Sequence, residues 1–332
     1  MYGLATAAAA PSTWRVSPCT ITVDFPGRLR HTVRPATILR LPSGVYYWQK
    51  LLRLPALPRS ARSAGRYLLL ILLALLFCLP LLWMLSTSLK NDVQTYHVPP
   101  IWLPWPMRVA NYPEALQAQP FGLFFLNSMQ YACSAVIGQL LSCSLAAYGF
   151  ARLRWKGRDI LFGLCLATLM LPYQVTMVPL FITFKTLGWV NTYRPLIVPT
   201  FFGSAYFIFL LRQFFLTIPQ ELTEAARIDG SSELGILTRI IIPLARPALV
   251  VVALIEFLFT WDNYLGPLIY LNSQQLFPLA IGLQLFQSSF VEKLAWPYLM
   301  AATTVVILPV IVLFFFAQHA FVEGITITGT KG

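Results

Sequence analysis

Long apolar stretches without charged residues alternate with short polar loops along most of this chain. A helix needs about 20 apolar residues to cross the hydrocarbon core of a bilayer, and several of these stretches approach or exceed that length. Prolines interrupt two of them, Pro172 and Pro179 in one and Pro309 in another. The pattern predicts six membrane spans: Tyr67–Leu89, Ala115–Ala151 (an approach segment and one span), Ile160–Phe184, Pro195–Leu211 with an extension to Phe215, about Ala248–Tyr270, and Leu294–Val322.

Composition agrees with that pattern and locates the basic charge. Of 332 residues 57% are hydrophobic and 11% charged, whereas soluble domains carry about 25% charged residues. We therefore expect an all-α polytopic membrane protein, with a six-span domain at residues 67–332. Residues 1–66 hold ten Lys/Arg and one acid, so the net charge of +12 belongs mainly to this arm and does not indicate nucleic-acid binding. We expect a poorly ordered basic extension there, and whether residues 1–60 are functional stays open.

Basic residues also predict the orientation of the spans. They crowd ahead of the first span, between the second and third, and between the fourth and fifth. Because cytoplasmic loops carry an excess of Lys and Arg, both termini and the loop between spans four and five are expected in the cytoplasm. The loop after the first span reads "VPPIWLPWPMRVANYP" and is rich in Trp and Pro, which suits the membrane interface.

The loop at 219–247 contains the polar run "ELTEAARIDGSSE" between two apolar segments. Apolar side chains could line one face of a short helix there, and Gly230 would permit a bend. Such an element is suited to present a surface to a soluble partner, although an ordinary polar loop is the alternative. The side chains expected on the common face are Ala225, Ala226, Ile228, Leu234 and Leu237.

A spaced motif covers the same loop. Glu224-Ala225-Ala226 is followed after three residues by Gly230 and after nine more by Ile240, and Ile242-Pro243 then follows. This resembles the cytoplasmic signature of the inner-membrane permease subunits of ABC importers of the maltose-type carbohydrate group. One departure is conservative, since Ile242 stands where the family has Leu. The resemblance extends over about residues 67–332.

The resemblance implies that this motif forms a coupling helix seated in a groove of an ATPase subunit. Glu224 would pair with a basic residue of that subunit, Ala225 and Ala226 would allow close packing, and Gly230 would set the bend. The coupling set implied by the resemblance is Glu224, Ala225, Ala226, Asp229, Gly230, Ile240 and Pro243.

The implied partners are a second homologous permease subunit, two ATPase subunits and an extracytoplasmic solute-binding protein, in a prokaryotic inner membrane. The implied substrate is a carbohydrate. The chain has no GxxxxGK[ST] phosphate loop, so ATP and Mg are expected on the ATPase subunits, and we expect neither catalysis nor a cofactor here. The cysteines and histidines show no metal-ligand spacing. Which carbohydrate is carried, and whether the second permease is a copy of this chain, stay open.

Two acids lie within the expected fifth span, where ionisable residues are costly and are candidates for function. Glu256 and Asp262, with Trp261, Asn263 and Tyr264, could line a polar pathway. The family usually reads W-N-[DE]-[FY] here, so the acid has moved by one position, about 100° around a helix. Pairing with the partner permease is an alternative role. An ion-coupled secondary transporter using Glu256 and Asp262 is the alternative function, and an intramembrane enzyme lacks a plausible dyad.

Overall fold

A computed structural model describes residues 15–17, 20–22, 59–291 and 296–329. Most of the expected extension at 1–66 lies outside these described residues. The chain divides into two compact units, residues 1–74 and 75–332. Within the first, strands β1 (Arg15–Ser17) and β2 (Thr20–Thr22) pair antiparallel, with Val16 opposite Ile21.

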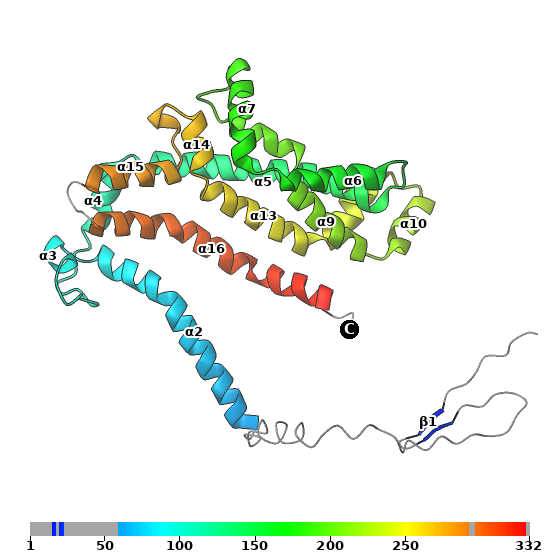
Figure 1. Ribbon diagram of the computed structural model, residues 1–332, viewed down its shortest axis with the longest axis horizontal. Coiled ribbons are helices and arrows are strands. Elements are labelled where there is room, and N and C mark those ends of the chain that lie inside the picture. Colours follow the sequence, from blue (N-terminus) through cyan, green and yellow to red (C-terminus); the bar gives the residue numbers. More distant parts are fainter. Residues whose placement is uncertain (1–14, 18–19, 23–58, 292–295, 330–332) are drawn as a thin grey trace, which may run out of the picture. The chain divides into compact units, whose positions relative to one another are not determined.

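Nearly all the other described elements are helical (Figure 1). The long helices are α2 (Arg59–Ser88), α5 (Phe121–Arg152), α13 (Arg246–Trp261) and α16 (Trp296–Gly329). The intermediate helices are α4 (Asn111–Ala118), α6 (Arg158–Ala167), α7 (Tyr173–Thr186), α9 (Ala205–Thr217), α10 (Gln220–Ile228) and α15 (Leu279–Val291). The short elements are α3 (Asp92–Thr95), η1 (Thr168–Met170), α8 (Arg194–Ile197), η2 (Val198–Phe202), α11 (Glu233–Ile236), the π-helical η3 (Leu237–Ile241), α12 (Ile242–Leu244), α14 (Leu265–Tyr270) and η4 (Gln274–Leu276).

The described residues contain four candidate spans, or six if each of two bent helix pairs counts as one span, in agreement with the expected number. Four helical segments are long and apolar enough to cross a bilayer: Gly65–Ser88, Phe121–Arg152, Arg194–Thr217 and Trp296–Gln318. Two bent pairs complete six, Arg158–Met170 with Tyr173–Thr186 and Glu233–Leu244 with Arg246–Trp261. The fourth span does run past Phe215, as its extension predicted.

Proline explains one of the two bends. The third span breaks by 98° between η1 and α7, where Leu171 precedes Pro172 and has an extended backbone with ψ 111°. A residue before proline is pushed out of the helical region by the proline ring, so the helix ends there. Pro179 lies inside α7 without ending it.

The fifth span differs from its predicted bounds. A continuous helix over about Ala248–Tyr270 was expected, but α13 ends at Trp261 and a separate α14 follows. Helix α15 after it was not expected. The polar Asp262 and Asn263 follow Trp261 directly, and the Asn263 side chain accepts from the N–H of Gly266 at 3.0 Å, a local contact that competes with continued helix. Pro267, "NSQQ" and Pro278 interrupt the apolar pattern further along.

Helix α5 is the central element. It packs against α9 and α13 (Figure 1) and also against η2, and small buried residues on it allow close approach. At Gly138 an added Cβ would collide with the side chains of Thr200 and Phe201 in η2. Small residues at helix contacts are typical of membrane proteins, because close backbone packing replaces the hydrophobic drive available in water. The small buried side chains on α5 include Ala132, Ala135, Cys143 and Ala147.

Candidate functional site

The motif predicted from the sequence lies on α10 and the turn that ends it. The backbone N–H of Ser231 donates to the carbonyl of Ala226 (2.9 Å), and the N–H of Gly230 donates to that of Arg227 (3.0 Å). These two bonds form a Schellman motif, which needs a left-handed residue just past the helix end. Gly230 is that residue, with a φ of +78°. The expected bend at Gly230 is therefore present.

Two faces of α10 have opposite environments. Thr223 and Ala226 are buried against the rest of the chain, whereas Glu224, Ala225 and Ile228 are exposed. Ala226 packs in the cluster that also contains Ile236 and Leu237. An exposed acid next to an exposed alanine gives α10 a free surface that a partner can approach closely.

The expectation of one shared apolar face across this loop is wrong. Ala226 and Leu237 face the core, but Ala225, Ile228 and Leu234 are exposed. Within α10, Ala225 and Ile228 lie off the face that buries Thr223 and Ala226. Leu234 and Leu237 belong to α11 and η3, which begin after the Gly230 turn and so do not continue the helical periodicity of α10.

A polar contact ties the loop to the central helix. Arg227 donates to both carboxylate oxygens of Glu233, at 2.7 and 3.2 Å, and the buried hydroxyl-bearing side chain of Tyr148 on α5 donates to the same carboxylate. The hydrogen bond and charge of Glu233 raise the pKa of the Arg227 guanidinium. Ser232 caps α11 by accepting from the N–H of Gly235 at 3.2 Å.

The last two residues of the predicted coupling set lie where the chain turns into α13. Ile240 is in η3 and packs against the core cluster, and Pro243 is in the first turn of α12. Between α12 and α13 the chain bends by 82° at the fully buried Ala245. Ile240 and Pro243 therefore position the loop rather than extend the exposed surface of α10.

A polar hollow of about 540 Å³ opens beside α10. Its walls come from the end of α5, the α5–α6 loop, α10 and α11. Arg152 in that wall is buried and donates to the carbonyls of Phe215 (2.6 Å) and Ile218 at the end of α9, where a cation satisfies carbonyls that the helix leaves free. The lining residues are Arg152, Leu153, Arg154, Trp155, Gln220, Glu224, Arg227 and Glu233.

The five residues considered for the pathway have different environments, some buried in the bundle and some exposed. Trp261 is buried and its Nε1 donates to the carbonyl of Val306 (3.3 Å). Asn263 donates to the hydroxyl of Tyr131 (3.0 Å). Glu256 is buried near Thr260, whereas Asp262 and Tyr264 are exposed. A lining role for these residues stays a prediction.

The family follows from a match to the second half of the chain. Residues 139–327, more than half of the 332, match the family described as the inner membrane component of binding-protein-dependent transport systems. The chain belongs to this family. Its match runs from α5 to α16 and includes the whole 219–247 loop. This permease is therefore a membrane component of an importer that works with a binding protein.

Several relatives of this permease are named for the solutes that their transport systems carry. It is 35% identical over 254 residues to the sulfoquinovosyl glycerol transport system permease protein SmoH of Agrobacterium fabrum, covering 76% of this chain and 88% of that one. It is 37% identical over 216 residues to the arabinooligosaccharides permease AraQ of Halalkalibacterium halodurans, covering 65% and 76%. It is 31% identical to the sn-glycerol-3-phosphate permease UgpE of Yersinia enterocolitica, covering 78% and 94%.

Solved structures support the fold of the permease. A chain of a bacterial ABC transporter that imports the acidic polysaccharide alginate superposes with a TM-score of 0.70 at 24% identity, covering 80% of this chain and 99% of that chain. A second chain, from that kind of transporter in complex with a periplasmic protein bound to an alginate pentasaccharide, gives 0.55 at 13% identity, covering 79% and 95%.

Sequence reasoning missed Tyr148, Arg152 and Glu233 of the permease. Tyr148 lies 85 residues from Glu233 in the chain, and the motif does not include either of them. The signal available was weak: a hydroxyl and a guanidinium close together in the otherwise apolar "SLAAYGFAR".

Proposed function

We propose that the chain is the permease subunit of an ATP-driven importer that moves a carbohydrate into the cytoplasm by alternating access. The observation that carries the proposal is the exposed face of α10, with Glu224 and Ala225 beside a Schellman turn at Gly230. Membership of the binding-protein-dependent transport family supports the assignment to an importer. The sugar and oligosaccharide names of the relatives support the substrate class.

In this proposal α10 faces the cytoplasm, because the segment from α10 to the first residue of α13 holds Arg227, Arg239 and Arg246. Both termini are then cytoplasmic, and the α4 end of the bundle faces outward. An ATPase subunit docks on the exposed face of α10, where a basic residue pairs with Glu224. ATP and Mg are held by that subunit, since this chain has no phosphate loop.

The proposed assembly has a second permease subunit, two ATPase subunits and an extracytoplasmic binding protein. The named complex of the alginate importer with a periplasmic protein supports the last of these by analogy. The small buried residues of α5 let its neighbouring helices pack closely against it, while the exposed apolar surfaces of the long helices are available to lipid and to the second permease.

The experiment is uptake into proteoliposomes that contain the full complex with ATP enclosed. Labelled carbohydrate should enter only when both ATP and the loaded binding protein are present. The ion-coupled alternative uses Glu256 and Asp262 and predicts the opposite: uptake driven by a proton or sodium gradient without ATP. Gradient-driven uptake that survives omission of ATP would overturn the proposal.

A further inference from the structure

The segment between α2 and α4 exposes an unusual density of apolar side chains. Val98 is 88% exposed and Trp105 84%, and no Asp, Glu, Lys or Arg lies between Asp92 and Arg108. We call residues 92–108 the aromatic loop. It lies at the opposite end of α5 from α10, since α4 leads directly into the first turn of α5. Its exposed apolar residues are Val93, Tyr96, Val98, Trp102, Leu103, Trp105 and Met107.

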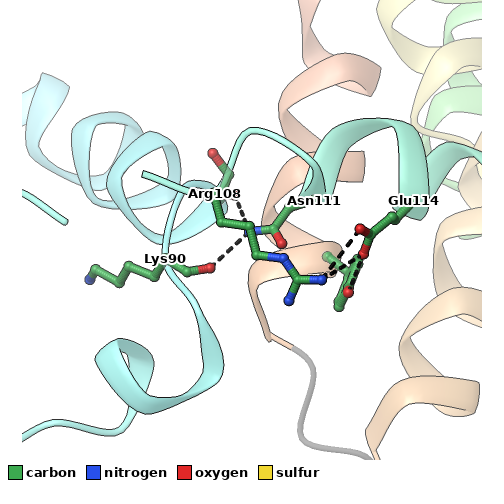
Figure 2. Close-up of polar contacts among 6 residues, drawn as sticks. Lys90, Arg108, Asn111 and Glu114 are labelled. Atoms are coloured by element: carbon green, nitrogen blue, oxygen red, sulfur yellow. Dashed lines mark hydrogen bonds and ion pairs between the residues drawn. The ribbon is translucent and has the colours of Figure 1, made fainter. Parts of the chain in front are cut away.

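Hydrogen bonds to backbone carbonyls close the aromatic loop at its base. The fully buried side chain of Asn111 donates to the carbonyls of Ser88 and Lys90, both at 2.8 Å, and Figure 2 shows Asn111 reaching toward Lys90. The N–H of Arg108 donates to the carbonyl of Leu89 at 2.8 Å. The residues after the loop are therefore held against the residues before it, at the end of α2 and just beyond it.

An ion pair fixes this base to the helix bundle. Arg108 and Glu114 form an ion pair (Figure 2), with 3.0 Å between a guanidinium nitrogen and a carboxylate oxygen, and the hydroxyl of Tyr298 on α16 donates to the same carboxylate. The hydrogen bond from Tyr298 and the charge of Arg108 hold the pKa of Glu114 below its usual value. Glu114 is therefore ionised at neutral pH and links α4 to α16.

Aromatic contacts brace the inner part of the loop. Trp102 meets Trp83 of α2 edge to face, with ring centroids 5.0 Å apart, and the Lys90 ammonium lies 3.8 Å from the centre of the Trp83 ring. Burial lowers the pKa of Lys90. With its base closed and Trp102 braced, the loop presents Val98, Leu103 and Trp105 on a supported backbone.

We propose that the aromatic loop lies in the headgroup layer of the bilayer and anchors the end of α2 and α4 there. The candidate span ends at Ser88, one residue before the loop closes on Leu89, so the base of the loop is at the membrane surface. Tryptophan and tyrosine favour that layer because their rings are apolar with one polar atom. The exposed leucines of α2, such as Leu82 and Leu85, continue the apolar surface toward the loop.

Charge distinguishes lipid from the binding protein as the occupant. A binding protein docks and departs, so its landing surface is in water for part of every cycle, and transient interfaces of that kind have polar rims. Between its ends the aromatic loop has no Asp, Glu, Lys or Arg, and from Val98 to Met107 every side chain is apolar or aromatic. Leaving Leu103 and Trp105 in water would expose apolar area at a cost of about 25 cal/mol per Å², which immersion in the interface removes.

Depth measurement in the full transporter complex tests this proposal. Val98 and Trp105 are replaced one at a time by cysteine in a background whose native cysteines are substituted, labelled with an environment-sensitive fluorophore, and reconstituted in phosphatidylcholine with or without spin-labelled lipid. Gln275 is the matched control, because it is exposed and lies in η4 at the same end of the bundle, where its carbonyl accepts from Asn127 near the start of α5.

Labels at 98 and 105 should lose about half their emission to a quencher placed shallow in the lipid, since interfacial segments sit ~5–10 Å into the headgroup region. Their emission should be blue-shifted relative to the label at 275, which the quencher should barely affect. Equal and weak quenching at all three positions would overturn the proposal. So would emission at 98 and 105 that responds to added binding protein and not to spin-labelled lipid.

Discussion

Gly230 has a φ of +78° and open space around the position of a Cβ atom. A side chain there meets no neighbour, so any penalty comes from the backbone alone. An L-residue in the left-handed region costs about 1–2 kcal/mol, and asparagine tolerates that region better than valine. The residue type at 230 thus controls whether the Schellman turn persists.

Gly230→Val should therefore loosen the turn and weaken the hold on the ATPase subunit, whereas Gly230→Asn should retain most of it. The measurement is the amount of ATPase subunit that copurifies with each variant. Gly188→Val is the strain control, because Gly188 also has a positive φ (+67°) and open space but lies between α7 and α8, outside the motif. Loss of the ATPase subunit in Gly188→Val to the same degree would assign the effect to general destabilisation.

Tyr148 connects the 219–247 loop to α5 through one hydroxyl. Hydrogen bonds to charged groups contribute about 1.5–3 kcal/mol, and the partial exposure of Glu233 reduces this to about 1 kcal/mol by solvent screening. We expect Tyr148→Phe to lower the solute carried per ATP hydrolysed while the ATPase subunit still binds.

A double-mutant cycle supplies the check on that expectation. The double variant Tyr148→Phe/Glu233→Gln should lose less solute transport per ATP hydrolysed than the sum of the losses in the two single variants, because both substitutions remove the same contact. Tyr206→Phe on α9 is the control, with a half-exposed ring elsewhere. Strictly additive effects would show that the contact does not transmit motion.

At the level of elements, the close crossing of α5 with η2 depends on Gly138. Overpacking of a tight contact costs about 1–3 kcal/mol, so Gly138→Leu should lower the melting temperature of the purified complex and reduce its yield. Gly149→Leu on the same helix has open space at its Cβ position and should melt at or slightly above the wild-type temperature, since leucine favours helix more than glycine. Equal melting temperatures for Gly138→Leu and Gly149→Leu would show that the close crossing of α5 with η2 does not depend on Gly138.

The elements also show what sequence can predict. Hydropathy located the spans, and the spacing of Glu224 and Gly230 located α10 and its turn, because both signals are local. The end of α13 at Trp261 and the separate α14 and α15 were missed, since an apolar run reads the same whether it continues or folds back. The Tyr148–Glu233 contact joins residues far apart in sequence, so no local pattern encodes it.

For the whole molecule, the excess of Lys and Arg in alternate loops predicts both ends in the cytoplasm. Single cysteines at Gln275 and Ser231 test this, because both positions are exposed and lie at opposite ends of the bundle. An impermeant maleimide added to intact cells should label position 275 and reach position 231 only after the membrane is opened. Labelling of 231 in intact cells would reverse the orientation.

The central claim is that the exposed face of α10 couples this permease to ATP hydrolysis on another chain. The most direct test is ATPase activity of the reconstituted complex, with and without loaded binding protein, for Glu224→Lys and for Asp92→Lys. Both replace an exposed acid with the same cation, but Asp92 lies at the opposite end of the bundle. Stimulation by the binding protein should be lost in Glu224→Lys and kept in Asp92→Lys. Undiminished stimulation in Glu224→Lys, with the variant assembled at normal levels, would contradict the claim.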